Sequence, residues 1–109
     1  MRPSIVDVSD ASGGTKDSNP IVLDYYGQAG VALQAVVTGT ATYTIQQTLD
    51  NPLTAGVTPT WFDHPDINLV AQTVNRQGNY AYTPIAVRVR QTAGNGSVRL
   101  TAIQTGLHP

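Results

Sequence analysis

The residues best suited to chemistry are concentrated in residues 60–66 (TWFDHPD), which hold the single Trp, the single Phe, two Asp and one of the two His of the chain. Asp63, His64 and Asp66 offer oxygen and nitrogen ligands for a metal ion. A structural zinc site, however, needs about four converging ligands, and Pro65 interrupts this irregular segment between two of the three. We therefore predict no metal here.

A packing role accounts better for the same segment. Trp61 and Phe62 each carry a large apolar surface, and we expect them to plug one end of the hydrophobic core. Asp63 would form a turn with its own backbone, and Pro65 would fix the direction in which the chain leaves. Trp61 and Phe62 are thus predicted to be structural core residues.

Catalytic patterns are weak elsewhere in the chain. The Ser residues stand in no G-x-S-x-G motif, Cys is absent, and the seven acidic residues are all Asp, mostly in segments where Asp is expected to form turns. The GNG of residues 94–96 does not open a helix, so it does not predict a phosphate-binding loop. We predict that the chain is not an enzyme, has no catalytic residue and binds no cofactor.

Composition limits the classes of partner. Charged residues make up 12% of the chain and the net charge is -1, too little positive charge to predict nucleic-acid binding. The sequence has no run of about 18 apolar residues and no apolar leader, so we expect neither a membrane span nor secretion. Because a protein of near-zero net charge tends to associate, we expect protein partners or self-assembly.

Alternating apolar residues predict β-strands. Residues 31–37 and 41–49 place apolar side chains at nearly every second position, as do residues 85–89 and 98–102. Residues 67–74 fit a strand or a helical turn, and the neighbouring strands favour a strand. No segment predicts a confident helix. The expected fold class is all-β, an antiparallel two-sheet sandwich of jelly-roll or immunoglobulin-like topology. We expect a flexible N-terminal arm over residues 1–19 and a single domain over residues 20–109.

A cluster of turn-forming residues at 93–96 (AGNG) separates the last two alternating segments, which predicts a β-hairpin. In a simple hairpin register, Arg99 lies beside Arg88 and Arg90 on one outer face. Three guanidinium groups would repel one another unless solvent or an acidic partner lies over them. A solvated face and a protein contact both fit, and Arg is enriched at protein interfaces.

Five aromatic residues raise a different function. Aromatic rings can stack on sugars, which would make the chain a carbohydrate-binding module. Alternation within the strands favours packing in the core or at a sheet edge for these rings. The residues concerned are Tyr25, Tyr26, Tyr80, Tyr82 and Trp61.

Three segments, TATYTIQQTLDNP, TPTWFDHPD and GNYAYTPIAVRVRQTAGNGSVRLTAIQTG, resemble small structural proteins of tailed bacteriophages. The resemblance covers residues 31–106, and its motifs are structural, so no catalytic residue carries over. It implies a virion protein, assembled in the host cytoplasm, that acts as a capsid decoration or cement protein and stabilises the head by bridging major capsid subunits. A tail, collar or fibre-anchoring subunit is the alternative.

Within that interpretation, two groups of residues are candidate protein contacts. Ile5, Val6 and Val8 of the arm would add a strand to the sheet of a neighbouring subunit. Arg88, Arg90 and Arg99 would make a polar contact. Many copies on one lattice, or a homo-oligomer on the particle, would strengthen weak contacts through effective concentration.

Overall fold

The computed structural model describes residues 4–9, 14–23, 31–80 and 84–104. These residues form nine β-strands and one short 3-10 helix, η1 (Ile67–Leu69), which lies between β6 and β7. In chain order the strands are β1 (Ser4–Ser9), β2 (Lys16–Asp17), β3 (Ile21–Val22), β4 (Val31–Thr38), β5 (Thr42–Thr48), β6 (Phe62–Asp63), β7 (Arg76–Tyr80), β8 (Ala86–Ala93) and β9 (Ser97–Gln104).

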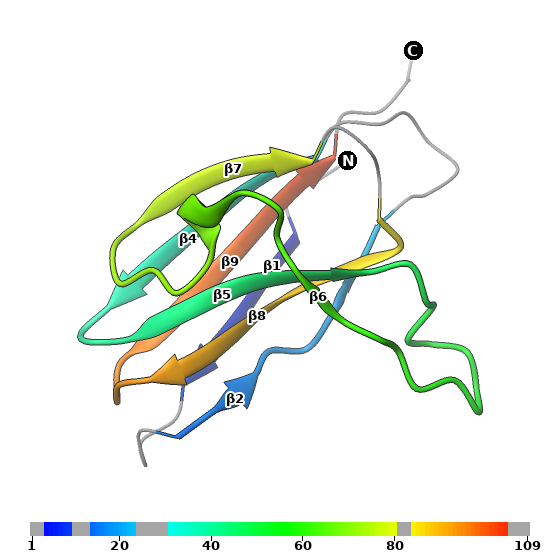
Figure 1. Cartoon of the computed structure of the whole chain (residues 1–109), viewed down its shortest axis with the longest axis horizontal. Coiled ribbons are helices and arrows are strands. Elements are labelled where there is room, and N and C mark those ends of the chain that lie inside the picture. The colour runs from blue at the N-terminus through cyan, green and yellow to red at the C-terminus, as the bar shows by residue number, and fades with distance from the viewer. Residues whose placement is uncertain (1–3, 10–13, 24–30, 81–83, 105–109) are drawn as a thin grey trace.

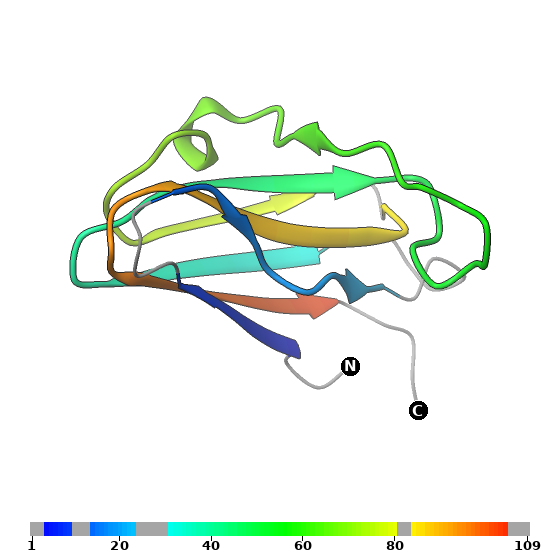
Figure 2. The same cartoon turned by 90° about the horizontal axis from the view of Figure 1, so that it is seen from below.

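The strands form two antiparallel sheets that pack face to face (Figures 1 and 2). Sheet A has the order β1-β9-β4-β7. Sheet B has the order β2-β8-β5-β6, with β3 also paired to β8. The predicted all-β, antiparallel two-sheet sandwich is therefore confirmed.

The strand order separates the two topologies that the sequence leaves open. The first strand, β1, pairs with the last, β9. The chain crosses from one sheet to the other at every connection between the named strands except β2–β3 and β5–β6. In the immunoglobulin order the first strand lies beside the second. The order here is that of a jelly roll, with β2 and β3 counted as two pieces of one strand because both pair with β8.

The hydrophobic core lies between the sheets and follows the alternation of the sequence. Val31 and Leu33 of β4 are buried, whereas the residues that follow each of them are exposed. Strand β5 differs, because residues 43–48 are buried without alternation. Its free edge pairs with the chain that runs from β6 to Gln72. The Thr44 and Gln46 side chains bond to Ala71 and Asp63 of that same segment. The central side chains of the core include Tyr43, Ile45, Leu69, Val87, Val89, Val98 and Leu100.

Much of the expected N-terminal arm belongs to the sandwich itself. Strand β1 pairs with β9 along its whole length, and β2 pairs with β8. Val8 is buried and Val6 packs against the core, whereas Ile5 is exposed. The apolar residues of β1 thus complete the edge of the chain's own sheet A, and residues 4–9 are part of the domain rather than an extension from it.

Residues 93–96 connect the two sheets and do not close a hairpin, so that prediction is wrong. Strand β8 belongs to sheet B and β9 to sheet A. The connection packs against the β4–β5 connection, where Gly96 N donates a hydrogen bond to Thr40 O (2.8 Å). A Cβ atom at Gly94 or Gly96 would collide with the backbone of Thr40, so this close approach requires glycine. A turn sequence specifies a reversal, but not whether the two strands pair.

Residues 67–74 begin with a 3-10 turn where a strand is predicted. The Asp66 carboxylate accepts a hydrogen bond from Asn68 N (2.9 Å) and caps η1. Leu69 is buried, whereas Ile67 and Val74 are exposed. The strand prediction is wrong because a strand would bury alternate residues of this segment. Here the conformation is set instead by a side-chain cap and by the burial of one apolar residue.

Candidate functional site

The three Arg residues predicted to share one face lie in different sheets. Arg88 and Arg90 are on β8 of sheet B, and Arg99 is on β9 of sheet A. Each forms an ion pair with an Asp from the N-terminal segment. The prediction of a single Arg face is wrong because the β8–β9 connection crosses from one sheet to the other.

Asp17 of β2 holds both Arg residues of sheet B. Arg90 Nε donates to Asp17 Oδ1 at 2.7 Å, and Arg88 Nη1 lies 3.4 Å from Asp17 Oδ2. The hydrogen bond from Arg90 lowers the pKa of Asp17 below its ordinary value of 3.8, against the opposing effect of burial. Asp17 is therefore ionised at neutral pH and fastens the short strand β2 to β8.

Arg88 is the centre of a polar row that crosses sheet B. Its Nε donates to Gln46 Oε1 (2.9 Å), and Gln46 Nε2 donates to Asp63 Oδ1 (2.9 Å). The guanidinium carbon lies 4.3 Å from the centre of the Trp61 ring, within the range of a cation–π contact. Burial lowers the pKa of Arg88, but an Arg stays charged near neutral pH. Through these contacts the Arg88 guanidinium joins β8 to the neighbouring strands of sheet B.

Arg99 and Asp7 form a separate pair on the outer face of sheet A. Arg99 Nε lies 2.9 Å from Asp7 Oδ1, and the two side chains are 59% and 57% exposed. The hydrogen bond from Arg99 lowers the pKa of Asp7. Exposed pairs add little stability because water screens them. Among the three Arg residues, Arg99 is the most accessible to a partner.

Trp61 and Phe62, predicted to plug the core, lie outside it. Phe62 is 62% exposed, and Trp61 packs on Arg88 at the surface of sheet B. The prediction is wrong because β6 is an edge strand whose two residues are both exposed.

His64 occupies the buried position in this segment. Its ring centre lies 4.3 Å from that of the buried Tyr80. His64 Nε2 donates to Asn79 O (2.9 Å), and Nδ1 accepts from Asp66 N (2.9 Å). These two bonds need one donor and one acceptor, which is the neutral imidazole. Burial accordingly lowers the pKa of His64 below its ordinary value of 6.5.

The three candidate metal ligands of residues 60–66 serve different parts of the fold. Asp63 accepts from Gln46, His64 binds the edge of β7, and Asp66 caps η1. Within the described parts of the chain, no three His, Cys, Asp or Glu side chains are grouped so that they could hold a metal ion.

Two of the five rings of the alternative aromatic platform lie within the described residues, and one of them, Trp61, packs on Arg88. Tyr80 is 2% exposed, and its hydroxyl donates to Gln47 Oε1 at 2.7 Å. Its packing in the core, which the alternation favours, is confirmed. Tyr25, Tyr26 and Tyr82 lie outside the described residues.

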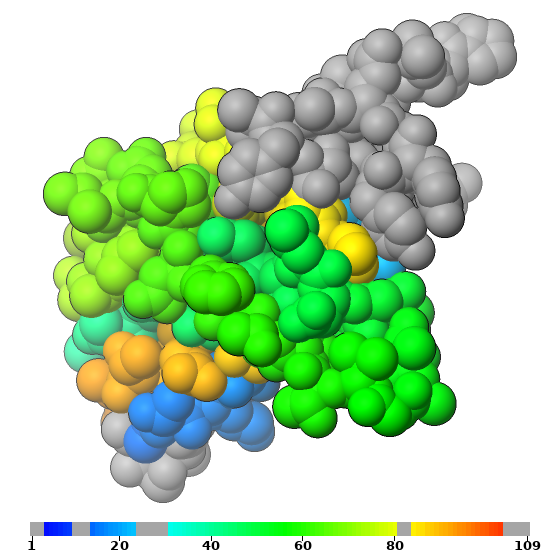
Figure 3. Space-filling view, turned by 45° about the vertical axis from the view of Figure 1, so that its right-hand side comes forward, coloured from blue at the N-terminus to red at the C-terminus, as the bar shows by residue number. Residues whose placement is uncertain are grey.

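A group of exposed apolar side chains on and beside the β5–β6 connection was not predicted from the sequence. We call it the apolar loop surface; it consists of Leu49, Leu53, Val57 and Phe62, which are 68%, 75%, 40% and 62% exposed. Figures 2 and 3 show the green connection projecting at one end of the molecule. Leu49 and Phe62 both line a hollow of about 270 Å³. The available signal was a run of apolar and Pro residues that fits neither the strand period nor the helix period.

Hydrogen bonds hold the base of this connection. Thr60 N donates to Asp50 Oδ2 (2.8 Å), and Leu53 N donates to Asn51 Oδ1 (2.9 Å). The first of these bonds joins the two ends of the connection, and the second forms a local Asx turn. The apolar side chains are therefore displayed from an ordered base.

Compared with models of known protein families and with curated proteins, the chain matches none. Among the residues that the structure describes, no helix is long and apolar enough to cross a membrane.

Proposed function

We propose that the protein is a structural subunit of a bacteriophage virion, and within it a capsid decoration or cement protein that stabilises the head by bridging major capsid subunits. The apolar loop surface is the observation that carries this proposal. Leu49, Leu53 and Phe62 are largely exposed on a connection that is hydrogen-bonded at its base. In this role the chain contributes shape and adhesion and turns over no substrate.

The energetics of apolar burial support an adhesive role. A Leu or Phe side chain gains about 1.5–3 kcal/mol when it passes from water into a fully apolar site. Aromatic residues are also enriched in the cores of protein interfaces. Leu53 and Phe62, seated in an apolar depression of a partner protein, would supply attachment without any chemistry.

The charged residues offer a polar contact of their own. Arg88 and Arg90 are engaged within sheet B, so the proposed polar contact falls to Arg99 and Asp7, which are more than half exposed. Strand β1 stands at the end of sheet A and pairs with β9. Strand addition by a neighbour would therefore use the outer edge of β1, beside the exposed Ile5.

The location on the head rests on the resemblance of residues 31–106 to structural proteins of tailed phages. Weak contacts suffice there, because many copies on one lattice hold together through effective concentration. The proposed partners are the major capsid protein, other virion proteins and further copies of the chain. Assembly would take place in the host cytoplasm.

A copy count in purified particles tests the proposal. We expect quantitative mass spectrometry to find hundreds of copies, and particle imaging to place them at repeated lattice positions on the head. A count of about ten, with ring symmetry about the tail, would replace decoration with a tail, collar or fibre-anchoring role. Absence from the particle would overturn the virion proposal altogether.

A further inference from the structure

The connection between β8 and β9 carries the single Asn-Gly pair of the sequence, Asn95–Gly96. Asn followed by Gly is the pair most prone to spontaneous loss of the side-chain amide, because Gly has no side chain that hinders attack by its backbone nitrogen. Asn95 is exposed, whereas Gly96 is partly buried. The reacting side chain is therefore accessible, and the surroundings of Gly96 decide whether the reaction takes place.

The reaction is a hydrolysis that passes through a cyclic imide. Gly96 N loses its proton and forms a bond to Asn95 Cγ, and the side-chain nitrogen leaves as ammonia. Water then opens the ring at either of its carbonyl carbons. The product is an aspartate or an isoaspartate at position 95, and in the isoaspartate the main chain is longer by a methylene group.

Three hydrogen bonds hold the atoms that would have to move. Gly96 N donates to Thr40 O (2.8 Å). Gln91 Nε2 donates to Gly94 O (3.0 Å) and to Gly96 O (3.2 Å). Gln91 is fully buried, so the carbonyl groups before and after Asn95 are bound to one amide group inside the sandwich.

The space around the connection is equally restrictive. A Cβ atom at Gly94 would collide with the backbone of Thr40, and one at Gly96 would collide with the carbonyl of Thr38. Turning the 95–96 peptide toward the Asn95 side chain would therefore require the β4–β5 and β8–β9 connections to separate. A main chain lengthened by a methylene group does not fit into this space either.

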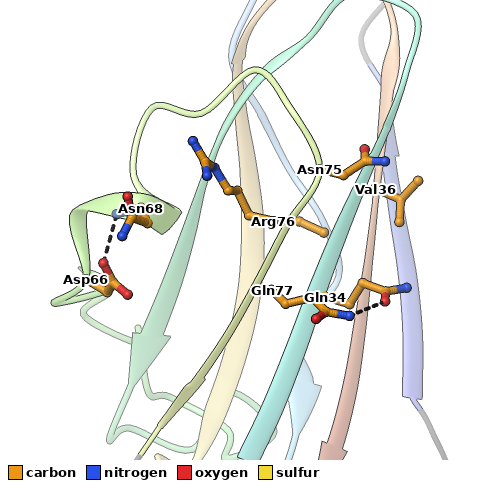
Figure 4. Close-up of a pocket in the computed structure, with 8 residues that line it drawn as sticks. Gln34, Val36, Asp66, Asn68, Asn75, Arg76 and Gln77 are labelled. Carbon is orange, nitrogen blue, oxygen red and sulfur yellow. Dashed lines mark hydrogen bonds between the residues drawn. The ribbon is translucent and has the colours of Figure 1, made fainter.

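Other Asn residues of the chain are less reactive by sequence and provide internal comparisons. Asn68 and Asn75, which lie apart beside β7 (Figure 4), are followed by Leu69 and Arg76, whose side chains hinder the attack. Asn75 Oδ1 also accepts a hydrogen bond from Val37 N (2.8 Å). The remaining Asn residues precede Pro or Tyr, and Pro has no backbone N–H that could react.

We propose that Asn95 is a latent deamidation site, which the hydrogen bonds from Gln91 and to Thr40 keep unreactive until the β8–β9 connection opens. Opening frees Gly96 N to attack, and an isoaspartate then prevents the connection from closing again. The site thus converts a transient local opening into a permanent loss of stability. It does not rest on the proposed role in a virion.

Time courses on the full chain test the site, in native buffer and in denaturing urea at the same pH and temperature. Peptide mass spectrometry measures the conversion of each Asn to an acid. We expect conversion in urea to be concentrated at Asn95. In the folded chain the same conversion should be at least roughly tenfold slower, because it requires local opening.

Two variants test the role of the contacts. Gln91→Met keeps an unbranched side chain but donates no hydrogen bond, and Gly94→Ala forces the connection away from Thr40. Each should speed the conversion of Asn95 severalfold in native buffer and leave the rate in urea nearly unchanged. Gly56→Ala is the matched control, because it changes another glycine of positive φ that has open space around it, and its native rate should equal that of the wild type.

Three results would overturn the proposal. The first is an equal rate at Asn95 in native buffer and in urea, which would show that the fold gives no protection. The second is that in urea Asn95 does not react or reacts more slowly than another Asn. The third is an unchanged native rate in both Gln91→Met and Gly94→Ala. All three are measured on the isolated chain, so they leave the particle count unaffected.

Discussion

His64 Nε2 donates a hydrogen bond of 2.9 Å to the backbone carbonyl of Asn79. His64 directly follows β6 of sheet B, and Asn79 belongs to β7 at the edge of sheet A. The bond therefore ties the two sheets together along one open side of the sandwich. It is supported by the neighbouring Tyr80, which packs against the His64 ring and donates to Gln47 of β5.

We predict that the free energy of unfolding falls as the pH drops below about 6.5. Burial lowers the pKa of His64 in the folded chain, so the unfolded chain takes up a proton in this range while the folded chain does not, and protonation favours unfolding. Asp7 and Asp17, whose pKa values lie below 3.8, lose their contributions only in more acidic solution. Urea unfolding between about pH 7.5 and 5 measures the effect.

The His64→Gln variant is the control for this pH dependence. Gln keeps a donor for the Asn79 carbonyl but does not titrate, so the stability of the variant should be nearly constant over the same range. His108→Gln should retain the dependence. A wild-type stability that does not change with pH would contradict the assignment.

We predict that Asp17→Asn destabilises the fold more than Asp7→Asn does. The first change leaves the partly buried Arg88 without its opposite charge, which we expect to cost about 1–3 kcal/mol. The second removes an exposed pair and should have little effect. Urea unfolding measures the loss of stability in both variants. The fluorescence emission of the single Trp, which packs on Arg88, should change only in Asp17→Asn. Equal destabilisation of the two variants would count against the polar row.

We predict that Gly94→Ala is more destabilising than Gly56→Ala. Both residues have positive φ angles, +89° and +80°, so both substitutions pay roughly 1 kcal/mol for that conformation. A Cβ at Gly94 would also collide with the backbone of Thr40, whereas Gly56 has open space around it. We expect at least about 1 kcal/mol of further loss at Gly94, measured by thermal unfolding. Similar losses at both positions would show that the two sheet connections do not pack closely.

We predict that Leu53→Ser and Phe62→Ser leave stability nearly unchanged, because both side chains are largely exposed. Binding to particles that lack the protein should weaken roughly tenfold or more if these residues form the centre of the contact. Ile103→Ser, which changes an exposed apolar residue on sheet A, is the matched control and should bind normally. Co-sedimentation with particles provides the measurement, and normal binding of both loop variants would remove the apolar loop surface from the proposed interface.

Much of the fold is predictable because alternation is a local signal. Val31 and Leu33 report the buried face of β4, and Val98 and Leu100 report that of β9, without reference to any other part of the chain. The candidate site was predicted less well. Arg88, Arg90 and Arg99 were singled out correctly as charged residues of strands, but their partners, Asp7 and Asp17, lie far away in the sequence. No local pattern indicates those contacts.

The sequence by itself determined the all-β class, the positions of the long strands and the face that each long strand buries, since these follow from side-chain periodicity within a few residues. Tertiary structure alone decided which sheet each strand joins, and therefore that Arg99 lies apart from Arg88 and Arg90. It also placed His64 inside and Phe62 outside, against their ordinary hydropathy. The physical reason is that the burial of a side chain at a sheet edge depends on which distant strand covers it. A hydrogen-bond partner such as the Asn79 carbonyl then makes the burial of a polar ring favourable.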